Sequence, residues 1–404
     1  VQLSNISCVS LSEFNSMDAL KLKQCCGHWC VFVSLVDGGS NGHGTVRCFL
    51  EGYSVACSVA SRIVVLCNHS VIHRNKNVDM SECGGGFSGI VRSAQLEHPN
   101  ICMHLIDLGD KGSACSAQLG LLLAHNFGDE LELCIRDEKV YKKRYHAESI
   151  LDSSCIPTAQ MTSGAVIITG GMGGLGLLTA KVLVEMQYCR HVVLVSRSGK
   201  VSRGGQGLEE ELSWLLQYDL QRDGRMVHVM RCDVSDESDV LSLLRDVREV
   251  CGSIVGVVHA AGVLRDGLLR GGKAAKCLDD VFDAKVKSAN LLNVHTKDDQ
   301  LEAFICFSSV AAAFGNPGQS VYGAANASLD EIVRDRRSNA LCGVSVQWPS
   351  VMGVGMAATL GVDMEELSVS PSFVGDVLRS VLHSCDQEVL TVFPVGLLGV
   401  VSSQ

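Results

Sequence analysis

Four polar side chains in the second half of the chain could together reduce a carbonyl group. Ser309 ends an apolar run, Tyr322 lies 13 residues later, and Asn326 follows Tyr322 by four positions. Residues four apart share one face of a helix, so the tyrosine and the asparagine are expected to lie on the same face. A tyrosine can protonate a carbonyl oxygen when a nearby cation lowers its pKa, and Lys285 is the candidate cation. Each residue also has an ordinary structural interpretation, but their order and spacing favour chemistry.

A glycine-rich segment earlier in the chain could hold the hydride donor. It reads TGGMGGLG and contains both G-x-G-x-x-G and T-G-x-x-x-G-x-G. The segment follows an apolar run and opens a helical pattern, so backbone and helix N-terminus can approach a pyrophosphate. A purely structural glycine turn is the alternative. The predicted contacts are Thr169, Gly170, Gly171, Met172, Gly173, Gly174, Leu175 and Gly176.

The next apolar run indicates which dinucleotide is bound. An acidic residue at its end would favour NAD, but this chain has Ser196 and Arg197 there, which suit a 2′-phosphate. We therefore expect NADPH, with an ordinary surface charge as the alternative for Arg197. His259 could be a catalytic base or a core histidine that binds only protein groups. The remaining expected cofactor contacts are Asp233, Val234, His259, Ala260, Ala261, Gly262, Pro349 and Ser350.

Alternating elements must position these residues. Strands are predicted at Ala165–Thr169, His191–Ser196, Met226–Arg231, Ser253–His259, Ala303–Ser308, Gly343–Gln347 and Val389–Phe393. Helices are predicted at Gly174–Gln187, Leu208–Gln221, Glu237–Val250, Ala275–His295, Gln319–Arg336 and Ser372–His383. This alternation predicts an α/β fold with a doubly wound, seven-stranded parallel sheet.

The first half alternates less clearly and predicts a smaller α/β domain without a complete glycine fingerprint. Its expected strands are His28–Leu35, Ser61–Leu66, Ile101–Leu108 and Leu131–Ile135, and its expected helix is Ala117–Asn126. A segment rich in small and polar residues, 150–163, is the expected boundary. We therefore predict domains of residues 1–158 and 159–404.

Composition excludes several classes of protein. The 404 residues are 47% hydrophobic and carry a net charge of −10, which argues against a disordered chain or a nucleic-acid binder. No apolar run is long enough to span a membrane. The chain starts with Val and shows no secretory signal, so we expect a processed chain or a piece of a longer one, located in the cytoplasm. The 19 cysteines show no C-x-x-C, and the cluster of Cys25, Cys26, His28 and Cys30 lacks metal-ligand spacing. We expect a reducing compartment and no metal.

The motifs together resemble one known family, the ketoreductase domains of modular type I polyketide synthases and animal-type fatty acid synthases. These domains are a branch of the short-chain dehydrogenase/reductase superfamily. Most members of that superfamily carry lysine four residues after the tyrosine, whereas these ketoreductases have asparagine there and lysine on the preceding helix, as at Asn326 and Lys285. The matching stretches are Thr169–Gly176, Leu194–Gly199, His259–Asp266, Phe307–Asn326 and Gly353–Ala357.

The first half also resembles this family. Residues Glu97–Leu108 and Leu131–Tyr145 are similar to the end of its non-catalytic structural subdomain, which is Rossmann-like but binds no cofactor. The resemblance thus implies two Rossmann-like subdomains, a degenerate N-terminal structural one and a catalytic one.

The resemblance implies a mechanism and partners. NADPH would deliver hydride to a β-ketoacyl thioester carried by an acyl carrier protein, with neighbouring synthase domains in cis. Tyr322 would protonate the carbonyl oxygen, Ser309 would polarise it, Lys285 would lower the pKa of the tyrosine, and Asn326 would hold the proton relay. Lys287 is expected on another helix face.

Some positions depart from the family pattern. Trp348-Pro349-Ser350-Val351 replaces the bacterial Trp-Gly-Pro-Trp, and Leu264-Arg265-Asp266 replaces the Leu-Asp-Asp that marks one hand of alcohol. Phe314 stands where reductases of the other hand have tryptophan, so the first hand is favoured. The expected substrate contacts are Asp266, Phe314 and Met356. The basic residues Arg265, Arg270, Lys273 and Lys276 form either a docking patch for the carrier protein or a solvated face.

Two other functions stay open. One is a short-chain dehydrogenase that acts on a free alcohol or ketone, which activity on thioesters would distinguish. The other is a catalytically idle scaffold or an epimerase, which would bind NADPH without reducing a ketone.

Overall fold

The computed structural model of the chain describes residues 29–33, 46–47, 49–50, 53, 62–67, 86–107, 130–136, 139–146, 162–201, 207–218, 226–270, 273–354, 368–383 and 387–393. The expected helix Ala117–Asn126, the expected boundary after residue 158, Met356, and Cys25, Cys26 and His28 lie outside these residues.

The chain divides into two compact units, and neither is one contiguous stretch. The first unit contains Val1–His146, Arg265–Phe282 and Ala311–Glu331, and the second contains Ala147–Leu264, Asp283–Val310 and Ile332–Gln404. Two segments from the second half of the sequence thus belong to the first unit. Two contiguous domains, 1–158 and 159–404, stay a prediction.

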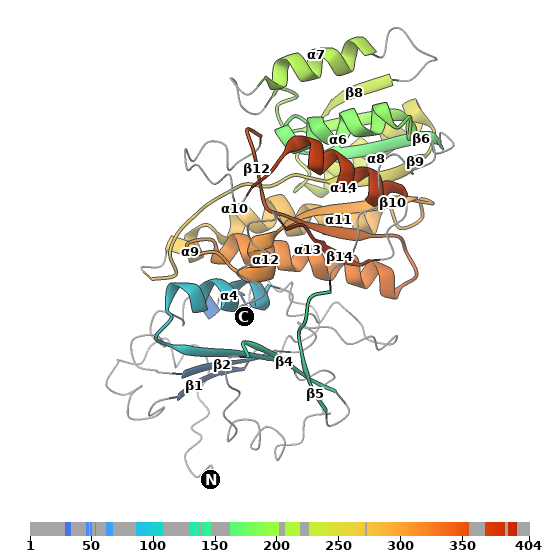
Figure 1. Cartoon of the computed structure of the whole chain (residues 1–404). Helices are drawn as coiled ribbons and strands as arrows, with labels where there is room; N and C mark the ends of the chain where they lie inside the picture. The colour runs from blue at the N-terminus through green and yellow to red at the C-terminus, as the bar shows by residue number, and fades with distance from the viewer. Residues whose placement is uncertain are drawn as a thin grey trace. The chain divides into compact units, whose positions relative to one another are not determined.

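The second unit is built on a seven-stranded sheet, as the sequence predicted (Figure 1). The strand order is β14-β11-β10-β9-β6-β7-β8, and every neighbouring pair is parallel. The order reverses between β6 and β9, which is where doubly wound sheets bind ligands at the carboxyl ends of their strands. The strands are β6 (Thr162–Thr169), β7 (Cys189–Ser196), β8 (Met226–Arg231), β9 (Ile254–His259), β10 (Ala303–Ser309), β11 (Val344–Trp348) and β14 (Val389–Thr391).

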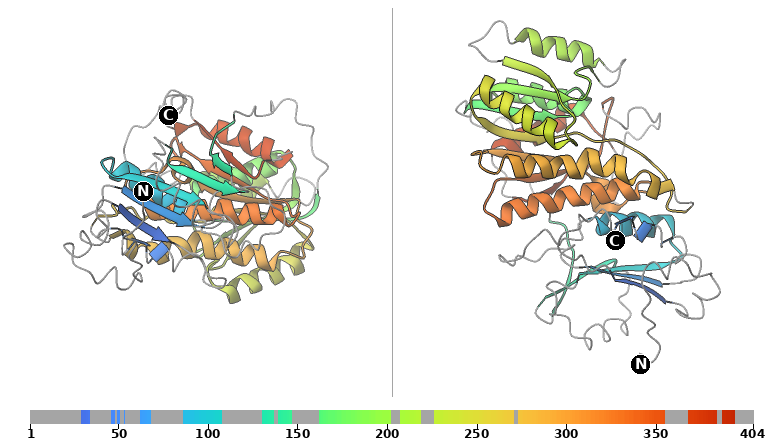
Figure 2. Two further views of the ribbon diagram at one scale, coloured as in Figure 1. Left: turned by 90° about the horizontal axis from the view of Figure 1, so that it is seen from below. Right: turned by 180° about the vertical axis from the view of Figure 1, so that it is seen from behind.

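Helices cover both faces of this sheet. Alternate strand residues such as Ile168 and Leu194 form one core cluster with Leu177 of α6 (Gly174–Glu185) and Leu378 of α14 (Pro371–His383). On the opposite face lie α8 (Glu237–Cys251) and α11 (Ser288–His295), as the view from behind in Figure 2 shows. The central strands β9 and β10 are buried on both faces, which explains why their sequences are largely continuous apolar runs, whereas the edge strand β8 is partly exposed. A further helix, α7 (Leu208–Tyr218), follows β7.

The prediction of one helix over Ala275–His295 was wrong. The structure has α9 (Lys273–Lys276), α10 (Leu278–Phe282), a π-helical turn η4 (Asp283–Lys287) and then α11. A π turn accommodates one extra residue, so the faces before and after it are out of phase with a continuous α-helix. By contrast, α13 (Ser320–Ser338) begins one residue after the predicted helix Gln319–Arg336 and ends two residues beyond it.

The first unit contains a smaller, mixed sheet in the order β1-β2-β3-β4-β5. Its strands β1 to β4 pair in parallel, and β5 pairs with β4 in the antiparallel sense. The strands are β1 (Trp29–Val33), β2 (Arg62–Cys67), β3 (Cys102–Asp107), β4 (Glu132–Arg136) and β5 (Lys139–Lys142). The first four strands were predicted from the sequence, and β5 was not. In the described part of the chain, no helix is both long and apolar enough to cross a membrane.

Helix α4 (Phe87–Glu97) of the first unit was not predicted from the sequence. Gly84, Gly85 and Gly86 precede it, and a run of glycines is typical of a loop rather than of a helix. Its apolar residues Phe87, Ile90, Val91 and Ala94 nevertheless follow the spacing of an amphipathic helix, so the signal was present.

Candidate active site

The glycine segment forms a tight turn between β6 and α6. Gly170 has a φ of +64°, and a Cβ there would lie 2.8 Å from the carbonyl oxygen of Ala260, which follows β9. A Cβ on Gly176 would lie 2.4 Å from the carbonyl oxygen of Gly170. Side chains are therefore excluded where the end of β6, the end of β9 and the start of α6 meet.

The start of α6 suits an anion. The N-cap is Gly173, which offers no side-chain cap, and the first turn contains no acidic residue. The first-turn amides and the positive end of the helix dipole can then serve a phosphate. Because these features leave room for the pyrophosphate, the residues of this turn fit the dinucleotide predicted from the sequence.

Positive charge lies at the ends of the next two strands. The turn after β7 is held by a hydrogen bond from the Gly199 amide to the Ser196 hydroxyl at 3.0 Å, and Arg197 is exposed. Arg231, the last residue of β8, pairs in register with Ser196 and donates to the carbonyl oxygen of Arg197 at 3.4 Å. Arg231 was not among the cofactor contacts predicted from the sequence, although its place at the end of a predicted strand was a usable signal.

Asp233 and Val234 follow β8 at the expected edge of the cofactor site. The Asp233 carboxylate accepts hydrogen bonds from the amide and the hydroxyl of Ser235, at 3.1 and 2.7 Å. Val234 is buried. This turn leads into α8, whose N-cap Asp236 accepts from the amide of Asp239.

His259 is completely buried in a hydrogen-bond chain within the second unit. Its Nδ1 lies 2.8 Å from the hydroxyl of Thr169, and its Nε2 lies 2.9 Å from the carbonyl oxygen of Lys285. Burial, assisted by the Lys285 cation, lowers the pKa of His259 to about 3. A neutral ring donates from Nε2 to the carbonyl and accepts from the threonine at Nδ1. The geometry therefore supports a structural role for the side chain.

Lys285 lies on the π turn and is 3% exposed. Its Nζ donates to the carbonyl oxygen of Phe307, two residues before Ser309, at 2.9 Å. A Cβ on Gly262 would lie 2.9 Å from Cε of Lys285, so the side chain passes directly over that glycine. Lys287, by contrast, is exposed. The π turn thus directs one lysine toward the ends of β9 and β10 and the other toward solvent.

Ser309 ends β10 and is half-buried. It pairs in register with Trp348, whose ring contacts that of Phe307 edge-on at 5.6 Å between centroids. Pro349 is buried, and Ser350 begins the short strand β12 (Ser350–Val351), which pairs with β13 (Ser368–Val369). The segment that departs from the family pattern is therefore ordered by a strand pair of its own.

Tyr322 and Asn326 share the first turns of α13, in the first unit. Tyr322 is half-buried, and Nδ2 of the buried Asn326 donates to the Tyr322 carbonyl oxygen at 2.8 Å. Their common helix face agrees with their spacing in the sequence.

Two of the three expected substrate residues are described, and both lie in the first unit. Asp266 is exposed and accepts a hydrogen bond from Nε2 of Gln319 at 3.3 Å. The ring of Phe314 packs on Tyr145 with 5.2 Å between centroids, and the Tyr145 hydroxyl donates to the carbonyl oxygen of Ala313 at 3.1 Å.

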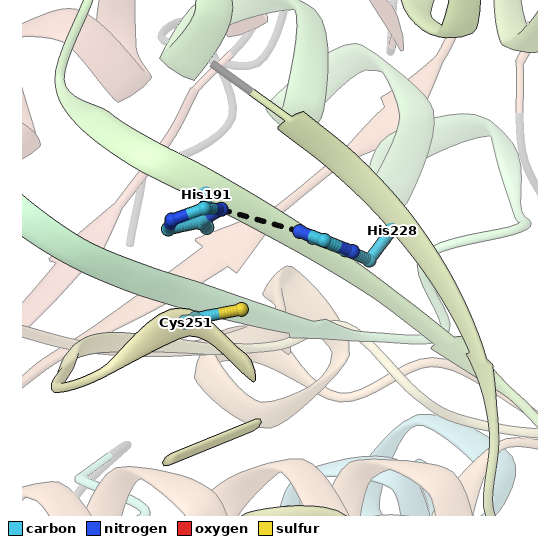
Figure 3. Close-up of side chains that lie close together, drawn as sticks. All are labelled: His191, His228 and Cys251. Carbon is cyan, nitrogen blue, oxygen red and sulfur yellow. Dashed lines mark hydrogen bonds between the residues drawn. The ribbon is translucent and has the colours of Figure 1, made fainter. Parts of the chain in front are cut away.

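Three potential metal ligands lie together elsewhere in the second unit (Figure 3). They are His191 of β7, His228 of β8 and Cys251 at the end of α8, with ligand atoms within 4.8 Å of one another. The two imidazoles hydrogen-bond to each other at 3.2 Å, and burial raises the pKa of the Cys251 thiol. A zinc site needs a thiolate and metal–ligand bonds of about 2.0–2.3 Å. The ligand atoms around a zinc ion therefore lie closer to one another, as a group, than these three atoms do. We assign no metal here, and the absence of a metal stays a prediction.

A doubly wound parallel sheet with a glycine turn at its switch point defines the class of Rossmann-type dinucleotide-binding proteins. Comparison with known proteins narrows this class. Residues 164–353 match the family model described as the KR domain. They are therefore a ketoreductase domain of the polyketide synthase type, within the short-chain dehydrogenase/reductase superfamily.

Individual relatives support this family assignment. Polyketide synthase GfsA of Streptomyces halstedii is 33% identical over 272 residues, which are 67% of this chain and 4% of that protein. Naringenin synthase of Pestalotiopsis fici is 32% identical over 336 residues, 83% of this chain and 12% of that protein. The chain thus spans a small part of these relatives. A solved structure of A-type ketoreductases from a modular polyketide synthase has a TM-score of 0.79 and 29% identity, and the match covers 95% of this chain and 81% of that one.

Proposed function

We propose that this chain reduces a β-ketoacyl thioester, carried on an acyl carrier protein, to the β-hydroxyacyl thioester with NADPH during polyketide or fatty acid synthesis. The observation that carries the proposal is the position of the buried Lys285 on the π turn. Its Nζ lies 2.9 Å from the carbonyl oxygen of Phe307, two residues before Ser309. A lysine on this earlier helix, with Asn326 four residues after Tyr322, is the arrangement that the resemblance to ketoreductases implies.

The glycine turn and the strand ends would hold NADPH. Gly170–Gly176 and the start of α6 would take the pyrophosphate, and Arg197 with Arg231 would take the 2′-phosphate. When bound, the cofactor supplies the hydride that adds to the carbonyl carbon.

The chain's own residues would handle the oxygen and its proton. Ser309 donates a hydrogen bond to the carbonyl oxygen, which stabilises the negative charge that develops there. Tyr322 transfers its hydroxyl proton to that oxygen, so that the ketone becomes an alcohol. Lys285 stabilises the remaining tyrosinate by its positive charge, and Asn326 orders the first turns of the helix that carries the tyrosine.

The partners we propose are an acyl carrier protein with its phosphopantetheine-linked substrate and neighbouring synthase domains in cis. The basic side chains of Arg265, Arg270, Lys273 and Lys276 are exposed in the first unit and could receive an acidic carrier protein, although Arg265 also contacts Asp280 at 3.3 Å. We propose a cytoplasmic, reducing location.

NADPH oxidation with a short β-ketoacyl thioester, followed by absorbance, tests the proposal. We expect turnover in the wild type and a loss on the order of a hundredfold or more in Tyr322→Phe. Tyr141→Phe, on β5, is the matched control and should keep wild-type activity.

The alternatives give different outcomes. Preference for free ketones over thioesters would indicate a dehydrogenase of another substrate class. NADPH binding without turnover, even when the substrate is presented on its carrier protein, would indicate an idle scaffold or an epimerase.

A further inference from the structure

Helix α4, from the first half of the sequence, contacts the segment that joins Ser309 to Tyr322 at several successive points. We call residues 311–319 the joining segment. Arg92 donates to the carbonyl oxygen of Ala312, and the Ser93 hydroxyl accepts from the amide of Asn316 at 3.2 Å. A Cβ on Gly315, whose φ is +75°, would lie 2.5 Å from the backbone of Arg92. The helix and the joining segment therefore fit backbone against backbone.

A buried ion pair fixes the helix side of this contact. The Arg92 guanidinium also binds both carboxylate oxygens of Glu132 on β4, and both side chains are 8% exposed. A buried arginine held by two carboxylate oxygens has little rotational freedom. Arg92 is thus a fixed donor to the joining segment.

Glu97, the last residue of α4, contacts two separate segments. Its Oε1 accepts from the amide of Gly318 and its Oε2 from the amide of Leu269, both at 2.9 Å. Leu269 belongs to the loop of residues 265–270, which we call the Asp266 loop. The amide of Gly267 in this loop also donates to the carbonyl oxygen of Gly318 at 2.8 Å. One carboxylate therefore ties the two segments to each other and to α4.

Both segments end next to residues of the proposed reaction. Gly318 precedes Gln319, whose carbonyl oxygen accepts from the Gly323 amide at 2.7 Å in the first turn of α13, beside Tyr322. The Gln319 side chain donates to the Asp266 carboxylate. A displacement at Gly318 would therefore move both the start of α13 and the partner of Asp266.

We propose that Glu97 is a positioning residue, which sets the place of Tyr322 and of the Asp266 loop through the amides of Gly318 and Leu269. This role rests on the proposed reductase function. A glutamine at this position can accept a hydrogen bond only through Oε1, because its Nε2 is a donor. It therefore cannot accept from the amides of both Gly318 and Leu269 in the way that the two carboxylate oxygens do. Glu97→Gln should release one segment while keeping the volume of the side chain.

The test compares wild type, Glu97→Gln and Glu130→Gln. Glu130 lies in the same unit, and among the described residues its side chain pairs with the exposed Lys142 and Arg144, so it is the matched control. We expect Glu97→Gln to lower kcat about tenfold, because small misplacements of catalytic groups are costly. The Kd for NADPH should stay within about twofold, since the glycine turn belongs to the second unit, and Glu130→Gln should behave as wild type.

Amide hydrogen exchange provides the readout that is independent of turnover. In Glu97→Gln, exchange should accelerate in the peptides that contain Leu269 and Gly318, with little change in the peptides of β6 and α6. Equal kcat and equal exchange in Glu97→Gln and Glu130→Gln would overturn the proposal.

Failure of the proposed function looks different. A wild type that binds NADPH but never reduces a thioester would refute the reductase, while the exchange data would still decide whether Glu97 holds both segments. If Glu97→Gln does not fold, wild-type exchange decides: slow exchange at both amides supports the tie, and rapid exchange at either one overturns it.

Discussion

Gly89 of α4 and Gly323 of α13 lie with their backbones in direct contact. A Cβ on Gly89 would stand 2.2 Å from both the carbonyl carbon and the carbonyl oxygen of Gly323, a distance that no real contact permits. Gly323 follows Tyr322 in the chain, so a helix from the first half of the sequence lies against the residue next to the proposed proton donor. A side chain at Gly89 would prevent this approach, and a Cβ on Gly323 would lie only 3.2 Å from the carbonyl oxygen of Gly89.

Gly89→Ala should therefore displace the start of α13. We expect kcat to fall on the order of a hundredfold, since a shift of about 1 Å can have that effect. Overpacking should also lower the free energy of unfolding by about 1–3 kcal/mol. Steady-state kinetics and urea denaturation measure the two effects.

The control for this variant is Gly375→Ala in α14. There the nearest atom to a new Cβ is the flexible end of Arg379, at 3.1 Å. Helix propensity should make this variant about as stable as the wild type or more so, with unchanged kcat. If Gly89→Ala matched it in both measurements, the contact between the two glycines would not constrain Tyr322.

Alanine substitutions of the two lysines on the π turn should have very different effects on kcat. Lys285→Ala removes the cation buried beside Phe307 and should reduce kcat by a factor of about 10²–10⁴, the range for groups that assist proton transfer. Lys287→Ala, two residues away and exposed, should leave kcat within about twofold. Comparable losses in both variants would argue that general positive charge, rather than the placement of Lys285, supports turnover.

Arg197 and Arg231 should select the cofactor. Removing both side chains should raise KM for NADPH by about 10- to 100-fold, because charge-assisted contacts to the 2′-phosphate are lost. KM for NADH, which lacks this phosphate, should change little. Arg190→Ala, an exposed arginine at the other end of β7, is the control. A parallel rise in KM for both cofactors would contradict the assignment of the 2′-phosphate to these arginines.

The buried His259 should make stability depend on pH. Its pKa falls from 6.5 to about 3 in the folded state, mainly because burial disfavours the charged ring. Below about pH 6.5, His259 binds a proton in the unfolded chain but stays neutral in the folded chain. The contribution of His259 to the free energy of unfolding is therefore complete above pH 6.5 and is lost as the pH falls toward 3. From pH 7.5 to 5.5 this group alone should lower the free energy of unfolding by roughly 1 kcal/mol.

Urea denaturation of wild type and His259→Gln at several pH values isolates this contribution. The variant should start less stable at pH 7.5, because it loses the hydrogen bonds to Thr169 and Lys285. Between pH 7.5 and 5.5 it should lose less stability than the wild type. Identical slopes in the two proteins would mean that His259 titrates alike in the folded and unfolded states.

The sequence by itself determined the strands of the second unit and its glycine turn. Continuous apolar runs are typical of strands buried on both faces, and the glycine turn depends on residues adjacent in the chain, so both patterns are local. The spacing of Tyr322 and Asn326 likewise requires only helical geometry. These features were predictable because short-range sterics and burial decide them.

Tertiary structure alone decided what holds these elements in place. The π turn that buries Lys285 depends on packing over Gly262 and on the carbonyl of Phe307, and no local pattern distinguished it from an α-helix. The contacts of α4 with the joining segment link residues more than 200 positions apart. Such contacts require that backbone surfaces fit closely and that single buried polar groups find partners. Both conditions depend on the path of the whole chain and not on any periodicity within the sequence.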